Sequence, residues 1–368
     1  MPSSLTTPHR IPSLDGLRAV SIALVLILHF GGGVTNPSAW LTAALPFVGN
    51  GDLGVNIFFV ISGFLITGLL IREEERNGRI AIGHFYVRRA FRIWPAYYLL
   101  IGVVAVLAFA SMVPTTRADL WSASLFLWNY TGGSGDQWTL AHTWSLAVEE
   151  QFYLLWPLTL ACVTGFVARR RIAMAIIVLS PFIRLVTYVV QPSLRTRIPT
   201  MLHTRADTLM FGCLLALLLA DPELRPAVER GVARGLHWIA IPVIFIASPL
   251  LTLRFRGAFI ILAGRTLDGV AIACIVAWVV LRPGGRTGRF LNSPFVVQIG
   301  VRSYSLYLWQ QLFARSVPGL PDLPLLVRLL ALVVVAEASY RLVETPMLRL
   351  RQRYEGTRRE STVSGAAR

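Results

Sequence analysis

The sequence predicts an all-α, polytopic integral membrane protein with about ten transmembrane helices. Hydrophobic residues make up 55% of its 368 residues, and only 15% are charged. The mean hydropathy is +0.60, whereas a soluble chain usually has about a quarter of its residues charged. Ten apolar runs are long enough, or nearly long enough, for the roughly 20 helical residues that a membrane span needs.

Each predicted span is an apolar run bounded by polar or arginine-containing segments. In chain order the runs cover 19–34, 53–71, 93–113, 143–167, 172–190, 207–220, 236–253, 267–281, 295–313 and 325–343. The sixth and eighth runs are short, so the alternatives for them are re-entrant segments and spans extended by flanking residues. We expect residues 1–348 to form one transmembrane domain and residues 349–368 to form an Arg-rich, disordered cytoplasmic tail.

The basic residues, all of them arginine, give the predicted orientation. If the N-terminus is cytoplasmic and all ten runs cross, 23 of the 35 arginines lie on the inner side, eight on the outer side and four within the runs. This bias follows the positive-inside rule and places both termini in the cytoplasm. The net charge of +16 therefore reflects membrane topology, and we expect no nucleic-acid partner. The three cysteines lie in apolar runs without metal-ligand spacing, so we expect no metal site.

The first apolar run contains a histidine. An ionisable group at membrane depth is costly unless it faces a partner or a cavity, which makes His29 a candidate functional residue. Arg18 precedes it by eleven residues, so both side chains lie on one helix face, about 16 Å apart along the axis. Asp15 lies on roughly the same face. The alternatives are a packed structural histidine and an arginine that reaches to the membrane surface.

Two adjacent carboxylates, Glu149 and Glu150, lie near the start of the fourth run, in a polar and aromatic segment that begins at His142. Paired acids in an apolar helix need partners, and a carboxylate beside a histidine can form a general-base pair. The alternative is a polar belt at the outer membrane interface. Helical spacing and sequence proximity give this motif its supporting residues, which are Trp144, Ser145 and Tyr153.

Arginines at three- and four-residue spacing precede the third run. Arg88, Arg89 and Arg92 lie on a segment that the topology places in the cytoplasm, and guanidinium groups bind phosphate through bidentate hydrogen bonds. The cluster is therefore a candidate phosphate site. Its alternative role is that of a topology anchor.

Together these motifs resemble the acyltransferase 3 family, polytopic membrane O-acyltransferases of the type that acetylates bacterial O-antigen and exopolysaccharide. Leu14 to Arg18 followed by His29 matches that family's Arg-x10-His pattern. The resemblance covers about residues 10–350, and the further matching segments are 54–66 with Ser62, 85–95, 143–153, 205–212 with Asp207, 304–309 and 344–346. One departure follows Trp309, where family members often have histidine and this chain has Gln310.

The resemblance implies transfer of an acyl group, usually acetyl, from acyl-CoA (acetyl-CoA) to a hydroxyl group. The acceptor would be a glycan, a lipid-linked sugar or another small hydroxylated molecule. The donor is then a substrate, no cofactor is permanently bound, and the protein lies in the bilayer of the bacterial inner membrane. The resemblance predicts no oligomeric state.

The resulting hypothesis gives each candidate residue a role. His29 acts as general base on the acceptor hydroxyl, and a glutamate, Glu150 rather than Glu149, orients the imidazole. The cytoplasmic arginines bind the donor phosphates, and Arg18 either joins them or pairs with Asp15. An acyl-histidine intermediate is the alternative chemistry. A proton-coupled membrane transporter is the alternative function, because buried His, Glu and Asp207 also suit a proton relay.

Overall fold

A computed structural model describes residues 11–31, 51–132, 138–315 and 323–354, and within these ranges the regular structure is entirely helical. The all-α prediction is confirmed. The long helices are α1 (Pro12–Gly31), α3 (Gly51–Asn77), α4 (Ile82–Phe109), α8 (Thr143–Cys162), α9 (Phe166–Val190), α10 (Leu202–Ala220), α15 (Arg265–Leu281), α17 (Pro294–Ala314) and α18 (Leu325–Ser339).

Shorter helices connect or extend the long ones. They are α5 (Arg117–Ser124), α6 (Trp128–Thr131), α7 (Trp138–Ala141), α11 (Arg225–Ala233), α12 (Leu236–Pro242), α13 (Ser248–Phe255), α14 (Gly257–Phe259), α16 (Arg286–Leu291) and a 3₁₀ turn, η1 (Pro192–Arg197). Three π-helical turns, η2 (Val243–Ala247), η3 (Ile260–Gly264) and η4 (Tyr340–Glu344), lie within or directly after longer helices. Beyond η4 the chain stays helical to residue 354. The rest of the predicted tail, 355–368, lies outside the described residues.

Each of the ten predicted spans contains a helix, but these helices are not equally apolar. Seven helical stretches of the described chain are long and apolar enough to cross a membrane: 13–31, 52–77, 82–109, 166–190, 192–220, 236–255 and 257–281. The other three predicted spans correspond to α8, α17 and α18. Glu149 and Glu150 make α8 more polar, and Arg302 does the same for α17. A multi-pass membrane protein is therefore confirmed, and the number of ten crossings stays a prediction.

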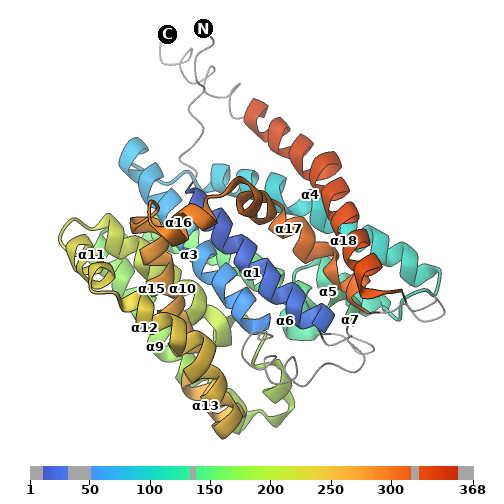
Figure 1. The fold of residues 1–368 in the computed structure, drawn as a ribbon, viewed down its shortest axis with the longest axis horizontal. Helices are drawn as coiled ribbons and strands as arrows, with labels where there is room; N and C mark the ends of the chain where they lie inside the picture. The colour runs from blue at the N-terminus through green and yellow to red at the C-terminus, as the bar shows by residue number, and fades with distance from the viewer. Residues whose placement is uncertain (1–10, 32–50, 133–137, 316–322, 355–368) are drawn as a thin grey trace.

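The helices around α1 and α3 form the centre of the molecule. Helix α3 packs against α1 and α10, α1 packs against α17, and α17 packs against α18 (Figure 1). Glycines allow these backbones to touch. A Cβ on Gly212 of α10 would lie 2.0 Å from the Val60 carbonyl oxygen of α3. A Cβ on Gly300 of α17 would lie 1.8 Å from the Asp15 carbonyl oxygen of α1.

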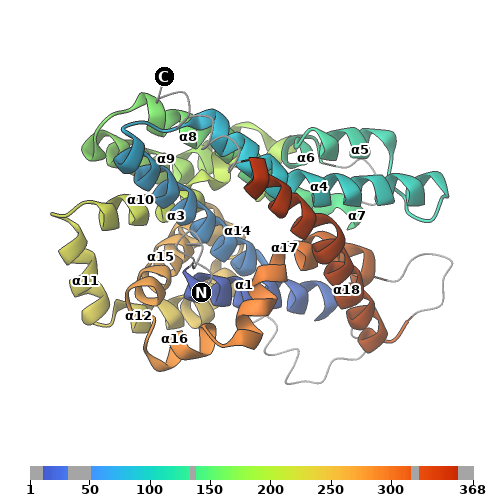
Figure 2. The same cartoon turned by 90° about the horizontal axis from the view of Figure 1, so that it is seen from above.

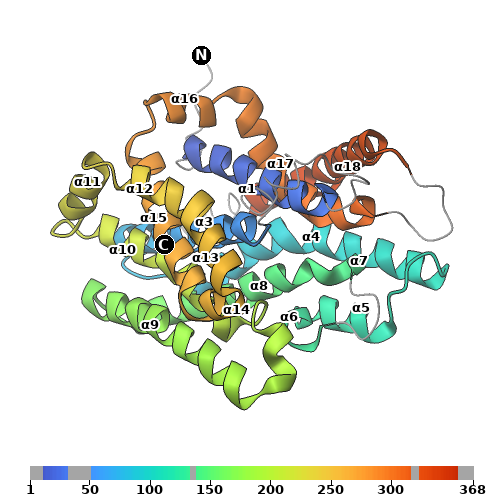
Figure 3. The ribbon, with the colours of Figure 1, turned by 60° about the horizontal axis from the view of Figure 1, so that its bottom comes forward.

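Helices α4 to α8 cover one side of this centre. Helix α4 packs against α5 and α8, and α6 packs against α8 (Figures 2 and 3). The short helix α7 lies directly before α8 and packs against α17. This contact brings the chain that enters α8 to the end of α17, close to the end of α1.

Candidate active site

His29 lies in the last turn of α1 and is half-buried. Its Nδ1 atom is 2.9 Å from the carbonyl oxygen of Val25, one helical turn earlier. A carbonyl oxygen only accepts hydrogen bonds, so Nδ1 carries the proton in this contact. In the neutral ring, Nε2 then has a free lone pair. The ring meets the Trp138 indole edge to face, with 5.5 Å between the ring centroids.

The end of α17 supplies two glutamines to this region. The main-chain carbonyl oxygen of Gln311 accepts a hydrogen bond from the Trp138 indole N–H at 2.9 Å. The Gln310 side chain is completely buried and approaches His29, yet neither of its polar atoms has a well-aligned hydrogen bond. Arg315, just after α17, lies over the Trp138 ring with 3.8 Å between its guanidinium carbon and the ring centroid.

A second histidine completes the cluster. His142, the residue before α8, is only 3% exposed and lies within electrostatic range of His29. Its Nδ1 atom is 2.7 Å from Gln311 Oε1, and its Nε2 atom has no hydrogen-bond partner. Tyr307 donates to the His142 carbonyl oxygen at 3.1 Å and bonds to Ser145 at 2.6 Å. The sequence identified the His142 and Gln310 segments but gave Gln311 and Tyr307 no role, because only helix packing brings them to His29.

Of the two glutamates, Glu149 lies within electrostatic range of Tyr307, whereas Glu150 lies beside Arg89. Glu150 accepts a hydrogen bond from the Trp94 indole at 3.3 Å and forms an ion pair with Arg89 at 3.9 Å. Within the described chain, neither Glu149 nor Glu150 forms a hydrogen bond or ion pair with His29. The predicted pairing of Glu150 with His29 therefore stays a prediction.

The supporting residues of the α8 motif lie in three different surroundings. Ser145 bonds to Tyr307 beside His142, whereas the Tyr153 hydroxyl is hydrogen-bonded to Ser62 and its ring stacks under Arg89, 3.5 Å from the guanidinium carbon. The guanidinium carbon of Arg205 is 5.0 Å from the centroid of the Trp144 ring. Tyr153 and Ser62 thus connect α8 and α3 near the arginines, while Ser145 belongs to the histidine cluster.

The predicted arginine site is assembled from α1 and α4. Arg18 forms an ion pair with Asp15 at 3.2 Å, and Arg88 forms one with Glu73 at 2.8 Å. Arg92 is exposed and lies within electrostatic range of Arg18 and Arg89. Among the described residues, it forms no hydrogen bond or ion pair. Arg92 is thus the arginine of the cluster with the most capacity left for an anion.

The contacts of Asp207 stabilise the packing of three helices. It is completely buried and forms an ion pair with Arg184, also completely buried, at 2.8 Å. The hydroxyl of Thr266 donates to the same carboxylate oxygen at 3.0 Å. These contacts join α9, α10 and α15. No group of three or more His, Cys, Asp or Glu residues in the described ranges is arranged to hold a metal ion.

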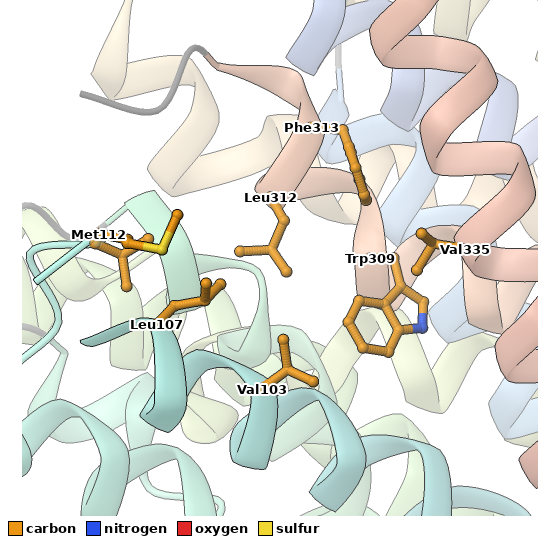
Figure 4. A pocket seen from close by; sticks show the side chains of 8 residues that line it. Val103, Leu107, Met112, Trp309, Leu312, Phe313 and Val335 are labelled. Carbon is orange, nitrogen blue, oxygen red and sulfur yellow. The ribbon is translucent and has the colours of Figure 1, made fainter. Parts of the chain in front are cut away.

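An apolar cavity of about 380 Å³ lies between α4, α17 and α18 (Figure 4). It is lined by Val103, Leu107, Met112, Val113, Trp309, Leu312, Phe313 and Val335. No ionisable side chain lines it. The apolar lining suits hydrocarbon groups. A thioester and a hydroxyl group in reaction need polar partners, which this cavity does not offer.

Comparison with known proteins identifies the family to which the chain belongs. A family model described as an acyltransferase domain matches residues 11–336. O-acetyltransferase OatA from Staphylococcus aureus strain NCTC 8325 / PS 47 is 31% identical over 369 aligned positions, as are the OatA proteins of strains COL and MRSA252. The alignments cover 93% of this chain but only 58% of those relatives. No solved structure matches. The chain belongs to the acyltransferase 3 family of membrane acyltransferases.

Proposed function

We propose that this protein transfers an acetyl group from acetyl-CoA on the cytoplasmic side of the membrane to a hydroxyl group of an acceptor. The acceptor is a glycan, a lipid-linked sugar or a small hydroxylated molecule. Membership of the acyltransferase family supports the reaction class, and the name of the OatA relatives supports an acetyl group and an oxygen acceptor. The chain spans little more than half of those relatives, so the acceptor of the whole relative is not carried over.

The observation that carries the proposal is the state of His29. Its Nδ1 proton is bonded to the Val25 carbonyl oxygen, so the Nε2 atom keeps a free lone pair. This atom lies in a polar cluster formed by the end of α1, the segment around α7 and the end of α17. An imidazole of this kind can take the proton of the acceptor hydroxyl as its oxygen attacks the thioester. It can instead attack the thioester itself and carry the acyl group.

The arginine cluster supports the proposal that the donor enters from the cytoplasmic side. Coenzyme A carries phosphates at one end and its thioester at the other, so the two ends need separate sites. The arginines of α1 and α4 provide positive charge about 16 Å along α1 from His29. The positive-inside rule places this end of α1 in the cytoplasm. The pantetheine arm would then run between the helices toward His29.

Glu150 serves the donor side in this proposal. Its bond to Trp94 and its ion pair with Arg89 hold the Arg89 guanidinium over the Tyr153 ring. A fixed guanidinium loses less entropy when it binds phosphate. The comparisons do not support the alternative function of a proton-coupled transporter, because the matched family and the relatives are acyltransferases.

The experiment uses membranes of the source strain after deletion of the gene and complementation with wild type or His29→Gln. Radiolabelled acetyl-CoA is added, and label in the glycan, lipid and small-molecule fractions is measured together with free thiol. A general base contributes about a hundred- to ten-thousand-fold to rate. Gln has no proton-accepting nitrogen, so we expect loss of transfer on that scale with normal membrane insertion.

The control is His203→Gln. His203 is exposed and bonds to the Tyr130 hydroxyl at 3.0 Å, away from the cluster, so transfer should stay near the wild-type level. The expected loss is much larger than tenfold. If His29→Gln transfers more than about a tenth of the wild-type amount of label, His29 is a structural residue. Acceptor uptake without thiol release would support the transporter instead.

A further inference from the structure

The protonation state of the His142 ring is fixed by its neighbour Gln311. Two atoms approach Gln311 Oε1: the main-chain nitrogen of His142 at 3.2 Å and its ring Nδ1 at 2.7 Å. A main-chain N–H can only donate, so the glutamine atom it meets is the amide oxygen. The ring nitrogen on that same oxygen must also donate. Nδ1 therefore carries the proton, and Nε2 of the neutral ring has the free lone pair.

That lone pair meets no hydrogen-bond donor in the described part of the chain, because the Leu308 carbonyl oxygen, which also approaches the ring, can only accept. Nε2 of His142 is buried and forms no hydrogen bond. Leaving a buried polar atom unpaired is costly, and such atoms in folded proteins often mark a site filled by water or a ligand. A lone pair calls for an O–H or N–H donor, and the hydroxyl group of the acceptor is such a donor.

The ring is also held in a fixed position. It packs edge to face on Tyr307 with 5.6 Å between the ring centroids, and the main-chain carbonyl oxygen of His142 accepts a hydrogen bond from the Tyr307 hydroxyl. Gln311, which sets its tautomer, also receives the hydrogen bond of Trp138, the residue that packs on His29. Two imidazoles with free Nε2 atoms are thus tied to one short stretch of α17.

We propose that His142 is the general base for the acceptor hydroxyl and that His29 carries the acyl group. This assignment rests on the proposed function and chooses between its two chemical routes. A single imidazole cannot hold the acyl group on Nε2 and take up a proton there at the same time. The second imidazole removes this conflict.

The two steps balance as follows. His29 Nε2 attacks the thioester carbonyl carbon, the C–N bond forms, the C–S bond breaks, and coenzyme A leaves as a thiolate. The acyl-imidazolium keeps its Nδ1 proton on the Val25 carbonyl. The acceptor oxygen then attacks the acyl carbon while His142 Nε2 takes its proton; the C–O bond forms and the C–N bond breaks. The electron pair returns to His29 Nε2, and the proton on His142 passes to water.

The key variant is His142→Asn. The asparagine amide can still donate to Gln311 in place of Nδ1–H, but it has no equivalent of Nε2. The purified protein in nanodiscs is mixed with acetyl-CoA labelled in the acetyl group, then quenched, and thiol release and protein-bound label are followed. We expect a burst of thiol, acetyl label retained on His29 by peptide mass spectrometry, and turnover with membrane acceptors reduced at least about a hundredfold.

Two further variants make the result specific. His237→Asn is the matched control, because His237 is also a buried histidine with an unpaired ring nitrogen but stacks on Trp278 in a distant helix. It should behave as wild type. Gln311→Met removes the oxygen that sets the tautomer without changing the imidazole, so it should also retain acetyl label and slow turnover.

Two results would overturn the proposal. One is a His142→Asn protein that keeps more than about a tenth of wild-type turnover, far from the expected loss. The other is lost turnover without retained label on His29 in both His142→Asn and Gln311→Met. A wild-type protein that releases no thiol and transfers no label would instead contradict the proposed function. If the His142→Asn protein does not fold, the Gln311→Met protein decides between these outcomes.

Discussion

The four arginines of the proposed donor site differ in the partners they already have. Arg88 forms an ion pair with Glu73 at 2.8 Å, and Arg18 forms one with Asp15 at 3.2 Å. Arg89 lies on the Tyr153 ring near Glu150. Arg92 forms no ion pair within the described residues and is exposed. A phosphate that binds here competes least with the protein's own carboxylates at Arg92.

Replacing Arg92 should therefore weaken donor binding more than replacing Arg88. A charge-assisted hydrogen bond is worth about 1.5 to 3 kcal/mol, so Arg92→Gln should raise the KM for acetyl-CoA roughly ten- to a hundred-fold. Arg88→Gln should change it little, because that guanidinium is already bound to Glu73. Steady-state kinetics over a range of acetyl-CoA concentrations measures both. Equal KM values in the two variants and wild type would return the cluster to its role as a topology anchor.

The buried pair of Asp207 and Arg184 gives a second prediction at the scale of single residues. Arg184 also donates to the Thr204 and Ile261 carbonyl oxygens, so it holds α9, α10 and η3 together. Asp207→Asn leaves a buried guanidinium without its counter-charge, which typically costs about 3 to 5 kcal/mol. We expect a clear fall in the thermal unfolding midpoint in detergent. Glu229→Gln, which breaks the exposed ion pair with Arg225, is the control and should leave the midpoint nearly unchanged.

At the scale of helices, the contact between α1 and α17 decides the geometry of the site. His29 lies on α1, and Gln310 and Gln311 lie on α17. Near their other ends the two helices touch where Gly300 meets the Asp15 backbone. Because helices are stiff, a shift at this contact changes the distance between His29 and the glutamines a few turns away. The glycine therefore acts on the site without lying in it.

Gly300→Ala should weaken both the fold and the activity. Its Cβ would lie 1.8 Å from the Asp15 carbonyl oxygen, so the helices must separate. Overpacking of this kind costs about 1 to 3 kcal/mol. Gly102→Ala in α4 is the control, because a Cβ there meets no atom within 4 Å. Thermal unfolding and acetyl transfer are measured for both, and an undisturbed Gly300→Ala protein would mean that α17 adjusts without moving the glutamines.

At the scale of the whole molecule, the proposed chemistry depends on sidedness. The proposed donor arginines and the histidine cluster lie toward opposite ends of α1, and the arginine distribution predicts that the arginine end faces the cytoplasm. Donor and acceptor would then reach His29 from opposite faces of the membrane. This arrangement lets a cytoplasmic thioester supply an acyl group to an acceptor on the outer side.

Single cysteines test the orientation. In a protein whose exposed native Cys162 is replaced by Ser, Ala118→Cys lies on the predicted outer side and Asn77→Cys on the predicted inner side; both positions are exposed. A membrane-impermeant thiol reagent added to intact cells should label position 118 and should reach position 77 only after permeabilisation. Labelling of position 77 alone in intact cells would reverse the orientation and remove the argument for a cytoplasmic donor.

The sequence by itself determined the all-α membrane class, the positions of the helices and the common face of Arg18 and His29. These properties depend on hydropathy and helical periodicity, which are local to the chain. It also identified the arginine cluster, since its members are close in sequence. Tertiary structure decided the neighbours of His29. Gln311 and His142 reach it only because α1 packs on α17 and α7 brings the start of α8 to the same helix end. Glu150 forms its ion pair with Arg89, and its predicted pairing with His29 stays a prediction. A periodic pattern shows which face of a helix is polar, but the packing of backbones at residues such as Gly300 selects the helix that this face meets.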